Sequence, residues 1–319
     1  MNRLIMFALA ISVYALPHGM VTAQQPAQEP HLSGTVTLSG AWAIYPTAVA
    51  WAQAFQQQHP KVRVNVSAGG AGKGAADVIA RLVDIGMVSR EPDPAELNKG
   101  ITPIYVLHDA VFPVVSEKNP VLQELLRTGV TLQTWIGIYI SGDITMWDQV
   151  VGRSSAKPIH VYTRSDSGGA AASWAKYLGG KQQEDLKGIG IYGDPGLLEA
   201  ARRDPVSIGY ANFSYVFSRE GPVIPGTRVV PIDANENGLA DLDERYETRD
   251  AAAEAIASGR YPAARKNYFF VMGPPSELVK AFIGFALSDE GTEIVKTVGA
   301  SLPVPVTERQ RVLDSFRAQ

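Results

Sequence analysis

Strands and helices alternate in the first part of the chain, and this order constrains the fold more than any other feature. The segments 34–40, 61–68 and 83–89 are short and rich in apolar or β-branched residues, which predicts strands. The segments 45–60 and 74–83 between them carry apolar residues at helical spacing. A β-α-β-α-β order is typical of an α/β fold with a largely parallel sheet.

A strand, a glycine-rich loop and a helix follow one another a second time at residues 158–179. Two long apolar stretches, 102–116 and 265–273, are extended enough to cross from one domain to another. With 319 residues the chain is long enough for about two domains. The remaining predicted elements are helices within 120–142 and 276–299 and strands at 207–216 and 227–233.

The first 23 residues have the features of a secretory signal peptide. Arg3 supplies a basic start, and the apolar run 4–16 is too short to span a bilayer comfortably. Small residues up to Ala23 offer a cleavage site. The alternative, an uncleaved membrane anchor, is disfavoured by the short run. Residues 24–33 form a polar linker that contains prolines.

The composition narrows the classes of partner. The chain has no cysteine, which excludes disulfides, thiolate metal sites and cysteine nucleophiles. A formal net charge of −3 argues against a nucleic-acid partner, because non-specific nucleic-acid binding needs a basic surface. We expect a monomeric, soluble periplasmic protein whose mature chain has no stable insertion in the membrane.

The segment 67–77, SAGGAGKGAAD, resembles a phosphate-binding loop only in part. A nucleotide-binding P-loop needs a glycine at the position of Ser67 and a hydroxyl residue after Lys73, where this chain has Gly74. The nucleotide interpretation is therefore disfavoured. Backbone N–H groups at the start of the following helix still suit an anion. A flexible turn with a solvated lysine is the alternative.

The second glycine-rich loop, TRSDSGGA at 163–170, strengthens the prediction of an anion site. Arg164 can bind an oxyanion through paired, charge-assisted hydrogen bonds, and Asp166 is close enough to orient it. Ser167, Gly168 and Gly169 offer further N–H or O–H donors. An ordinary surface Arg–Asp pair is the alternative. Two such loops in one exported protein suggest a cleft that both close.

Five segments together resemble the phosphate-type solute-binding proteins of bacterial ABC importers, in order through most of the mature chain. They are GAWAIYPTAVAWAQAF (40–55), SAGGAGKGAADVIARLVDIGMVSRE (67–91), SGDITMWDQVVG (141–152), TRSDSGGA (163–170) and SIGYANFSYV (207–216).

The resemblance implies a two-lobed class II periplasmic binding protein that is not an enzyme. It implies a small oxyanion, phosphate first, held between the lobes, and an inner-membrane ABC permease as partner. Lobe 1 would comprise 32–112 and 270–319, lobe 2 would comprise 113–269, and the hinge connections would be 109–116 and 265–273. Closure around a ligand that contacts both lobes follows from this architecture.

The resemblance also implies a set of ligand-binding positions. Arg164 and Asp166 match the family's arginine and the acid that orients it, and Ser67 matches a serine that contacts the anion. Ile44 and Tyr45 fall where the family uses backbone groups at a helix start. The predicted ligand-binding residues are Ala43, Ile44, Tyr45, Ser67, Gly69, Gly70, Lys73, Ser89, Arg90, Arg164, Asp166, Ser167, Gly168 and Gly169.

Several positions depart from the family's pattern and leave the ligand open. Ala41, Trp42 and Ala43 stand where hydroxyl residues are usual, as do Gly168 and Ala170 in the second loop. The aspartate that accepts the proton of hydrogen phosphate is replaced by Ser89 or Arg90. Molybdate, tungstate, sulfate, a phosphonate or an organic anion are therefore alternatives to phosphate. Trp42 would narrow the pocket, face an organic part of a larger ligand, or belong to the core.

The segment 233–244, DANENGLADLDE, fits the spacing of a calcium-binding loop. Gly238 permits the sharp turn that such loops need. The segment before it reads as a strand, so we expect a structural calcium site outside an EF-hand; an exposed acidic turn is the alternative. The predicted ligands are Asp233, Asn235, Asn237, Leu239 through its carbonyl, Asp241 and Glu244.

An exported phosphate-ester hydrolase is the second class of function. The five histidines are scattered, without metal or triad spacing. A β-lactamase-like set beginning at Ser154 and Lys157 is disfavoured, because Pro158 does not fit the helix that this motif needs. No convincing pair of nucleophile and base is found, so the binding protein is preferred.

Overall fold

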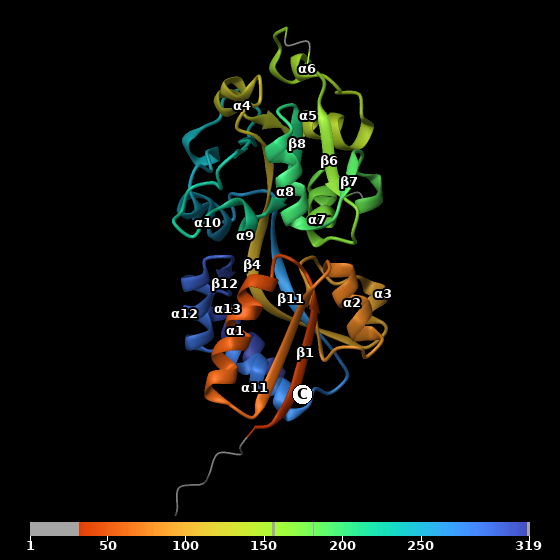
Figure 1. Ribbon diagram of the computed structural model, residues 1–319, viewed down its shortest axis with the longest axis vertical. Helices are drawn as coiled ribbons and strands as arrows, with labels where there is room; N and C mark the ends of the chain where they lie inside the picture. The colour runs from red at the N-terminus through yellow and green to blue at the C-terminus, as the bar shows by residue number, and fades with distance from the viewer. Residues whose placement is uncertain (1–31, 155–156, 181, 318–319) are drawn as a thin grey trace, which may run out of the picture. The chain divides into compact units, whose positions relative to one another are not determined.

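The computed structural model describes residues 32–154, 157–180 and 182–317 (Figure 1). The predicted signal peptide and the linker up to residue 31 lie outside the described residues. The part from Leu32 onward forms one compact unit.

One mixed sheet runs through this unit, with ten strands among the described residues. Its central order is β2-β1-β3-β11-β4-β8-β6-β7, and β9 and β12 also pair with β4. Its strands are β1 (Gly34–Gly40), β2 (Val62–Ala68), β3 (Ile85–Val88), β4 (Ile101–Ser116), β6 (His160–Arg164), β7 (Ile189–Ile191), β8 (Ser207–Asn212), β9 (Thr227–Val229), β11 (Ala264–Met272) and β12 (Leu302–Pro303). A separate pair is formed by β5 (Val130–Thr131) and β10 (Ile232–Asp233).

Parallel pairing is confined to the two ends of the sheet. Strand β1 is parallel to β2 and β3, and β6 is parallel to β7 and β8. Between them, β11 is antiparallel to β3 and β4, and β4 is antiparallel to β8. The expected α/β class is confirmed, with parallel strands in both halves joined by antiparallel ones.

The helices cover both halves of the sheet. The longer ones are α1 (Tyr45–Gln58), α2 (Ala71–Ile79), α4 (Leu122–Thr128), α7 (Gly169–Tyr177), α8 (Gly193–Arg203), α10 (Arg249–Ala257), α11 (Glu277–Ala286), α12 (Asp289–Val298) and α13 (Val306–Arg317). The short ones are α3 (Pro94–Leu97), α5 (Leu132–Ile136), η1 (Gly137–Ser141), α6 (Trp147–Val151), η2 (Gln183–Asp185), α9 (Phe213–Val216) and η3 (Leu242–Glu244). No helix in the described ranges is long and apolar enough to cross a membrane.

Buried apolar side chains form two clusters, which define two lobes. Lobe 1 packs around Trp51 and Phe269, and lobe 2 packs around Phe112 and Trp174. Strands β4 and β11 run between the two groups of elements (Figure 1). The cluster changes from lobe 1 to lobe 2 at 107–110 on β4 and at 264–268 on β11. These changeovers lie close to the expected hinge connections, while the predicted domain limits themselves stay predictions.

Most predicted elements match. The segments 120–142 and 227–233 are divided into several short elements, and the limits of two further elements differ for identifiable reasons. Helix α2 begins at Ala71, three residues before the predicted start, directly after its N-cap residue Gly70, which takes a positive φ of 96°. The predicted strand 207–216 ends at Asn212, and α9 follows. The apolar residues around Phe213 do not distinguish the strand from the helix, since buried segments of both kinds are continuously apolar.

Glycines within α2 serve packing against the sheet. A Cβ at Gly74 would lie 2.5 Å from the Met87 carbonyl oxygen and 2.8 Å from that of Ser39. A Cβ at Gly86 on β3 would lie 2.4 Å from the Gly74 carbonyl oxygen. The helix therefore approaches β1 and β3 more closely than side chains would allow.

Candidate functional site

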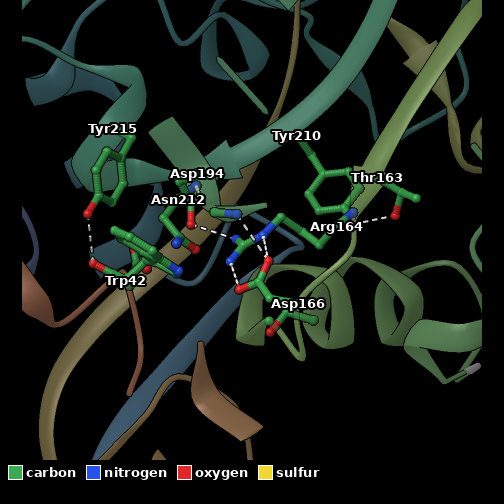
Figure 2. Close-up of polar contacts among 12 residues, drawn as sticks. Trp42, Thr163, Arg164, Asp166, Asp194, Tyr210, Asn212 and Tyr215 are labelled. Atoms are coloured by element: carbon green, nitrogen blue, oxygen red, sulfur yellow. Dashed lines mark hydrogen bonds and ion pairs between the residues drawn. The ribbon is translucent and has the colours of Figure 1, made fainter. Parts of the chain in front are cut away.

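Arg164, the last residue of β6, is buried between two carboxylates (Figure 2). Its Nε donates to Asp166 Oδ1 over 2.7 Å, and its Nη2 donates to Asp166 Oδ2. Its Nη1 donates to Asp194 Oδ2 over 2.6 Å. The exposed fractions of the three side chains are 1%, 5% and 0%. The guanidinium is thus fixed in a site shielded from water, where charge-assisted bonds are strong.

The opposite charges in this cluster stabilise each other's ionised forms. Burial alone would raise the pKa of the Asp166 carboxyl, but the hydrogen bonds and charge of Arg164 outweigh burial and lower it. Burial would lower the pKa of Arg164, but Asp194 and Asp166 together raise it. Arg164 and Asp166 are therefore both charged at neutral pH.

Asp194 also belongs to this cluster, although it was not among the predicted ligand-binding residues. It lies in the first turn of α8, where the helix dipole favours a negative charge. Its Oδ1 accepts the backbone N–H of Asn212 over 2.9 Å, and the neighbouring Gly193 N–H donates to Asp166 Oδ1 over 3.1 Å. The signal that could have found it is the acid in GDPG, directly before the helix-forming run LLEAARR.

The two glycine-rich segments meet directly. The N–H of Gly72 donates to the Ser167 carbonyl oxygen over 3.0 Å, although 95 positions separate the two residues. A Cβ at Gly70 would lie 2.6 Å from the same oxygen. A Cβ at Gly169 would lie 2.1 Å from the Ser89 hydroxyl oxygen. The structure therefore brings together Gly70, Ser89, Asp166, Ser167 and Gly169, all of them predicted ligand-binding residues.

The N–H groups of three predicted glycines already have protein partners. The N–H groups of Gly69 and Gly70 donate to the Gly40 carbonyl oxygen over 2.9 and 3.0 Å. The Gly168 N–H donates to Gln183 Oε1 over 2.9 Å, so Gln183 is a further polar neighbour of the loop.

The start of α1 also lies near this region, because Trp42 just before it contacts Tyr192 and Tyr215 of lobe 2. Ala43 and Ile44 are buried, and the N–H groups of Ile44 and Tyr45 both donate to the Ala41 carbonyl oxygen. To donate to a ligand in place of the Ala41 carbonyl oxygen, these two N–H groups would have to reorient.

Three predicted positions make their polar contacts outside the Arg164 cluster. Lys73 forms an ion pair with Asp77 one turn along α2. Arg90 forms an ion pair with Glu96, with Nη2 2.6 Å from Oε1. The exposed Ser67 donates to the Leu38 carbonyl oxygen over 3.3 Å. The two cations are neutralised locally, which leaves Arg164 as the buried cation of the predicted set.

Trp42 joins lobe 1 to lobe 2 through aromatic contacts. Its ring centroid lies 6.4 Å from that of Tyr45, 6.0 Å from Tyr192 and 6.5 Å from Tyr215, all edge to face. The Tyr215 hydroxyl donates to the Trp42 carbonyl oxygen over 3.3 Å (Figure 2). Trp42 Nε1 is buried without a hydrogen-bond partner in the described part of the chain.

A second buried ion pair lies where β4 and β11 cross between the lobes. Arg265 Nη2 donates to Asp109 Oδ2 over 2.9 Å and also contacts Asn212 Oδ1, and its Nη1 donates to Ser173 Oγ over 3.1 Å. Burial raises the pKa of the Asp109 carboxyl, against the opposing effect of Arg265. Since Asn212 also contacts Asp194, a chain of polar contacts links this hinge pair to Arg164.

A cavity of about 810 Å³ lies beside the second glycine-rich loop. It is lined from lobe 1 by the segment 90–94, and from lobe 2 by Ser167, Ser173 and Lys176. Arg265 also lines it. This volume is within the range typical of small-molecule sites, about 300–1,000 Å³.

The segment 233–244 forms a tight polar loop. Asp233 Oδ1 and Oδ2 accept the N–H groups of Asn237 and Gly238, and Glu244 Oε1 accepts that of Ala234. Asn235 and Asn237 donate their side-chain amides to Asp241 Oδ2. Within the described ranges, no group of three or more His, Cys, Asp or Glu side chains is arranged to hold a metal ion. Calcium binding by this loop stays a prediction.

Comparisons with known proteins agree with this two-lobed α/β architecture. A family model described as the PBP superfamily domain matches residues 25–290. The phosphate-binding protein PstS of Bacillus subtilis is 26% identical over 277 residues, 86% of this chain and 83% of that protein. Protein SphX of Synechococcus elongatus is 25% identical over 320 aligned residues, 98% of this chain and 89% of that protein.

Two solved structures have the same fold. One is a Clostridium perfringens substrate-binding protein assigned to phosphate ABC transport and crystallised with phosphate. It has a TM-score of 0.70 and 24% identity, and the match covers 85% of this chain and all of that one. The other is an ABC-type phosphate transport receptor of Vibrio cholerae. Its TM-score is 0.63 at 20% identity, with the same coverage.

The fold and the buried arginine site define a two-lobed solute-binding protein. Since the family model spans most of the chain, this protein belongs to the PBP superfamily.

Proposed function

We propose that this protein is an extracytoplasmic solute-binding receptor that captures a small oxyanion, phosphate foremost, and delivers it to an ABC permease. The observation that carries the proposal is the buried Arg164, held by Asp166 at the place where the two glycine-rich segments meet. A fixed guanidinium with free N–H donors suits a tetrahedral oxyanion. The relatives named as phosphate-binding proteins support phosphate as the first candidate.

The ligand reaches Arg164 by displacement of contacts between the lobes. Three of the five N–H groups of Arg164 are used by carboxylates, and two have no partner among the described residues. The pairing of Gly72 with Ser167 and of Trp42 with Tyr215 closes the approach from lobe 1. Opening of the lobes at β4 and β11 would break these contacts and admit the ligand.

We place this receptor in the periplasm and assign it binding without catalysis. The mature chain would act as a monomer in the periplasm after removal of the signal peptide, and it would bind its ligand without turnover. Its partner would be an inner-membrane permease that recognises the closed, ligand-bound form. Neither nucleic acid nor stable insertion in a membrane has a role in this proposal.

A thermal-shift panel tests the choice of ligand. The purified mature protein is heated with phosphate, sulfate, molybdate, tungstate and a phosphonate at matched ionic strength. We expect a saturable rise in Tm with phosphate, because a ligand that binds only the folded state stabilises it. No shift with any of the five would overturn the oxyanion receptor. Release of product from a chromogenic phosphate ester would instead favour the hydrolase.

A further inference from the structure

The buried charges around Arg164 do not balance. One guanidinium faces two carboxylates, Asp166 and Asp194, so the three groups sum to a formal charge of −1 when all are ionised. Asp194 is fully buried, and its second oxygen is held by the Asn212 N–H. Its carboxylate therefore occupies one side of the guanidinium in the way that an oxyanion ligand would.

The side chains that contact this cluster from β4, β11, β8 and α9 add no net positive charge. From β11 and β4, Arg265 and Asp109 form a neutral pair that reaches Asp194 through Asn212. From β8 and α9, the hydroxyl groups of Tyr210 and Tyr215 stay protonated, since burial raises the pKa of both well above neutral pH. A doubly charged anion beside Arg164 would therefore meet a net negative site in a region of low dielectric.

The excess charge is a property of lobe 2 alone. Arg164 ends β6, Asp166 follows in the same loop, and Asp194 opens α8, which packs on β6 and β8. Opening or closing of the lobes leaves these three residues together. The cations that lobe 1 could bring, Lys73 and Arg90, already pair with Asp77 and Glu96.

We propose that Asp194 determines the charge of the ligand: with its carboxylate on Arg164, the site favours a singly charged oxyanion over a doubly charged one. This inference rests on the proposed function and refines it. Two N–H donors of Arg164 remain for the ligand, enough for a paired contact. Each additional negative charge on the ligand lowers its affinity, because like charges repel strongly when they are buried close together.

The Asp194→Asn variant tests the inference by calorimetry with sulfate and inorganic phosphate. Asparagine keeps the shape and one acceptor oxygen for the Asn212 N–H, but it removes the charge and replaces the oxygen that accepts from Arg164 Nη1 with an NH2 group. We expect sulfate affinity to rise about tenfold or more. The matched control is Asp204→Asn, which makes the same change in net charge at the His160 contact of lobe 2 and leaves both affinities unchanged. Unchanged or weaker sulfate binding by the Asp194→Asn variant would overturn the inference.

A measurement on the wild-type protein stands independently of how the variant folds. Phosphate changes from mainly singly to mainly doubly charged across neutral pH. We expect its affinity for the wild-type protein to be higher at about pH 6 than at about pH 8, and this difference to shrink in Asp194→Asn. Stronger wild-type binding at the higher pH overturns the inference while leaving the receptor intact. No binding of either anion by either protein instead removes the proposed function itself.

Discussion

Two carboxylates hold Arg164 in one orientation before a ligand arrives. Because the side chain is already ordered, binding does not have to pay the entropy of fixing a long flexible cation. The same contacts keep the buried charge from being left alone, which would cost several kcal/mol. At the scale of single residues, the two acids therefore hold Arg164 in place, and we propose that they also weaken its attraction for anions.

Asp166 gives a pH-dependent prediction. Its pKa is lowered in the folded protein, so its contribution to stability is present above the unfolded pKa of about 3.9 and is lost as the pH falls through the folded value. We expect Asp166→Asn to lower the free energy of unfolding by about 3 kcal/mol at neutral pH. The deficit should shrink as the pH falls below about 4, as measured by urea denaturation.

The exposed Asp250 provides the matched control for this measurement. Asp250→Asn changes a side chain that is 92% exposed in the first turn of α10, and we expect a deficit of at most about 1 kcal/mol. A deficit for Asp166→Asn that stays constant down to strongly acidic pH would contradict the linkage.

Local pairs could be predicted from the sequence, whereas long-range ones could not. Asp166 lies two positions from Arg164, so its orienting role follows from spacing. Asp77 lies four positions after Lys73 on a helix, a spacing that also predicts the observed ion pair. Asp194 and Asn212 reach the site only through the register of β6 against β8 and the packing of α8, which no local pattern encodes.

At the scale of elements, small residues decide how the two glycine-rich segments meet. Gly70 and Gly72 admit the Ser167 loop, and Gly169 lets the start of α7 rest on Ser89. Gly74 lets α2 approach the sheet. The glycines that make these segments look like flexible anion loops thus also serve close packing. Glycine in a sequence marks a close approach without saying what approaches.

The contact of Gly169 with Ser89 predicts the effect of one added methyl group. In Gly169→Ala the new Cβ would meet the Ser89 hydroxyl and the Ser89 carbonyl oxygen, 2.1 and 2.5 Å away. Since a backbone atom cannot move aside cheaply, we expect a loss of about 1–3 kcal/mol in the free energy of unfolding. Urea denaturation measures this loss, provided that the m-value is the same for both proteins.

Gly284 is the matched control for this substitution. It lies inside α11 with open space around its missing Cβ, so Gly284→Ala should be neutral or stabilise by up to about 1 kcal/mol. Equal effects of the two substitutions would contradict the proposed close contact.

The loop 233–244 gives a metal-binding prediction. If calcium replaces the N–H groups that Asp233 now accepts, calorimetry of the wild-type protein will show one site per chain. Asp233→Ala should abolish it, because this residue opens the ligand pattern. Asp243→Ala removes an exposed acid from the same loop outside the pattern and should leave binding unchanged. Equal calcium binding by wild type and Asp233→Ala would refute the assignment.

Element types followed from periodicity, and the misjudged ends have local causes. The alternating run of β1 and the apolar face of α1 are strong signals, and both elements lie within two residues of their predicted ends. In the segment 120–142, which was predicted to be helical, the chain forms the short helices α4, α5 and η1, with the strand β5 between α4 and α5. Gly129, with a φ of 65°, ends α4 and starts this sequence of short elements.

At the scale of the whole molecule, the two lobes share one hinge and one polar network. Strands β4 and β11 cross between the lobes, and their buried Arg265–Asp109 pair contacts Asn212, which contacts Asp194 beside Arg164. A rearrangement at the hinge would therefore change the contacts of Asp194 beside Arg164. The α/β class and the family were predictable from the order of elements and motifs. This network was not, because its members come from five separate elements.

Calorimetric titration of phosphate into the wild-type protein and two arginine variants will show whether Arg164 binds the anion. We expect saturable binding of one phosphate per wild-type chain and a loss of affinity of about tenfold or more in Arg164→Lys, since lysine cannot make the paired contacts. Arg228→Lys, at an exposed ion pair with Glu117, should bind as the wild type does. Equal phosphate affinity in Arg164→Lys and wild type would contradict an oxyanion site at Arg164.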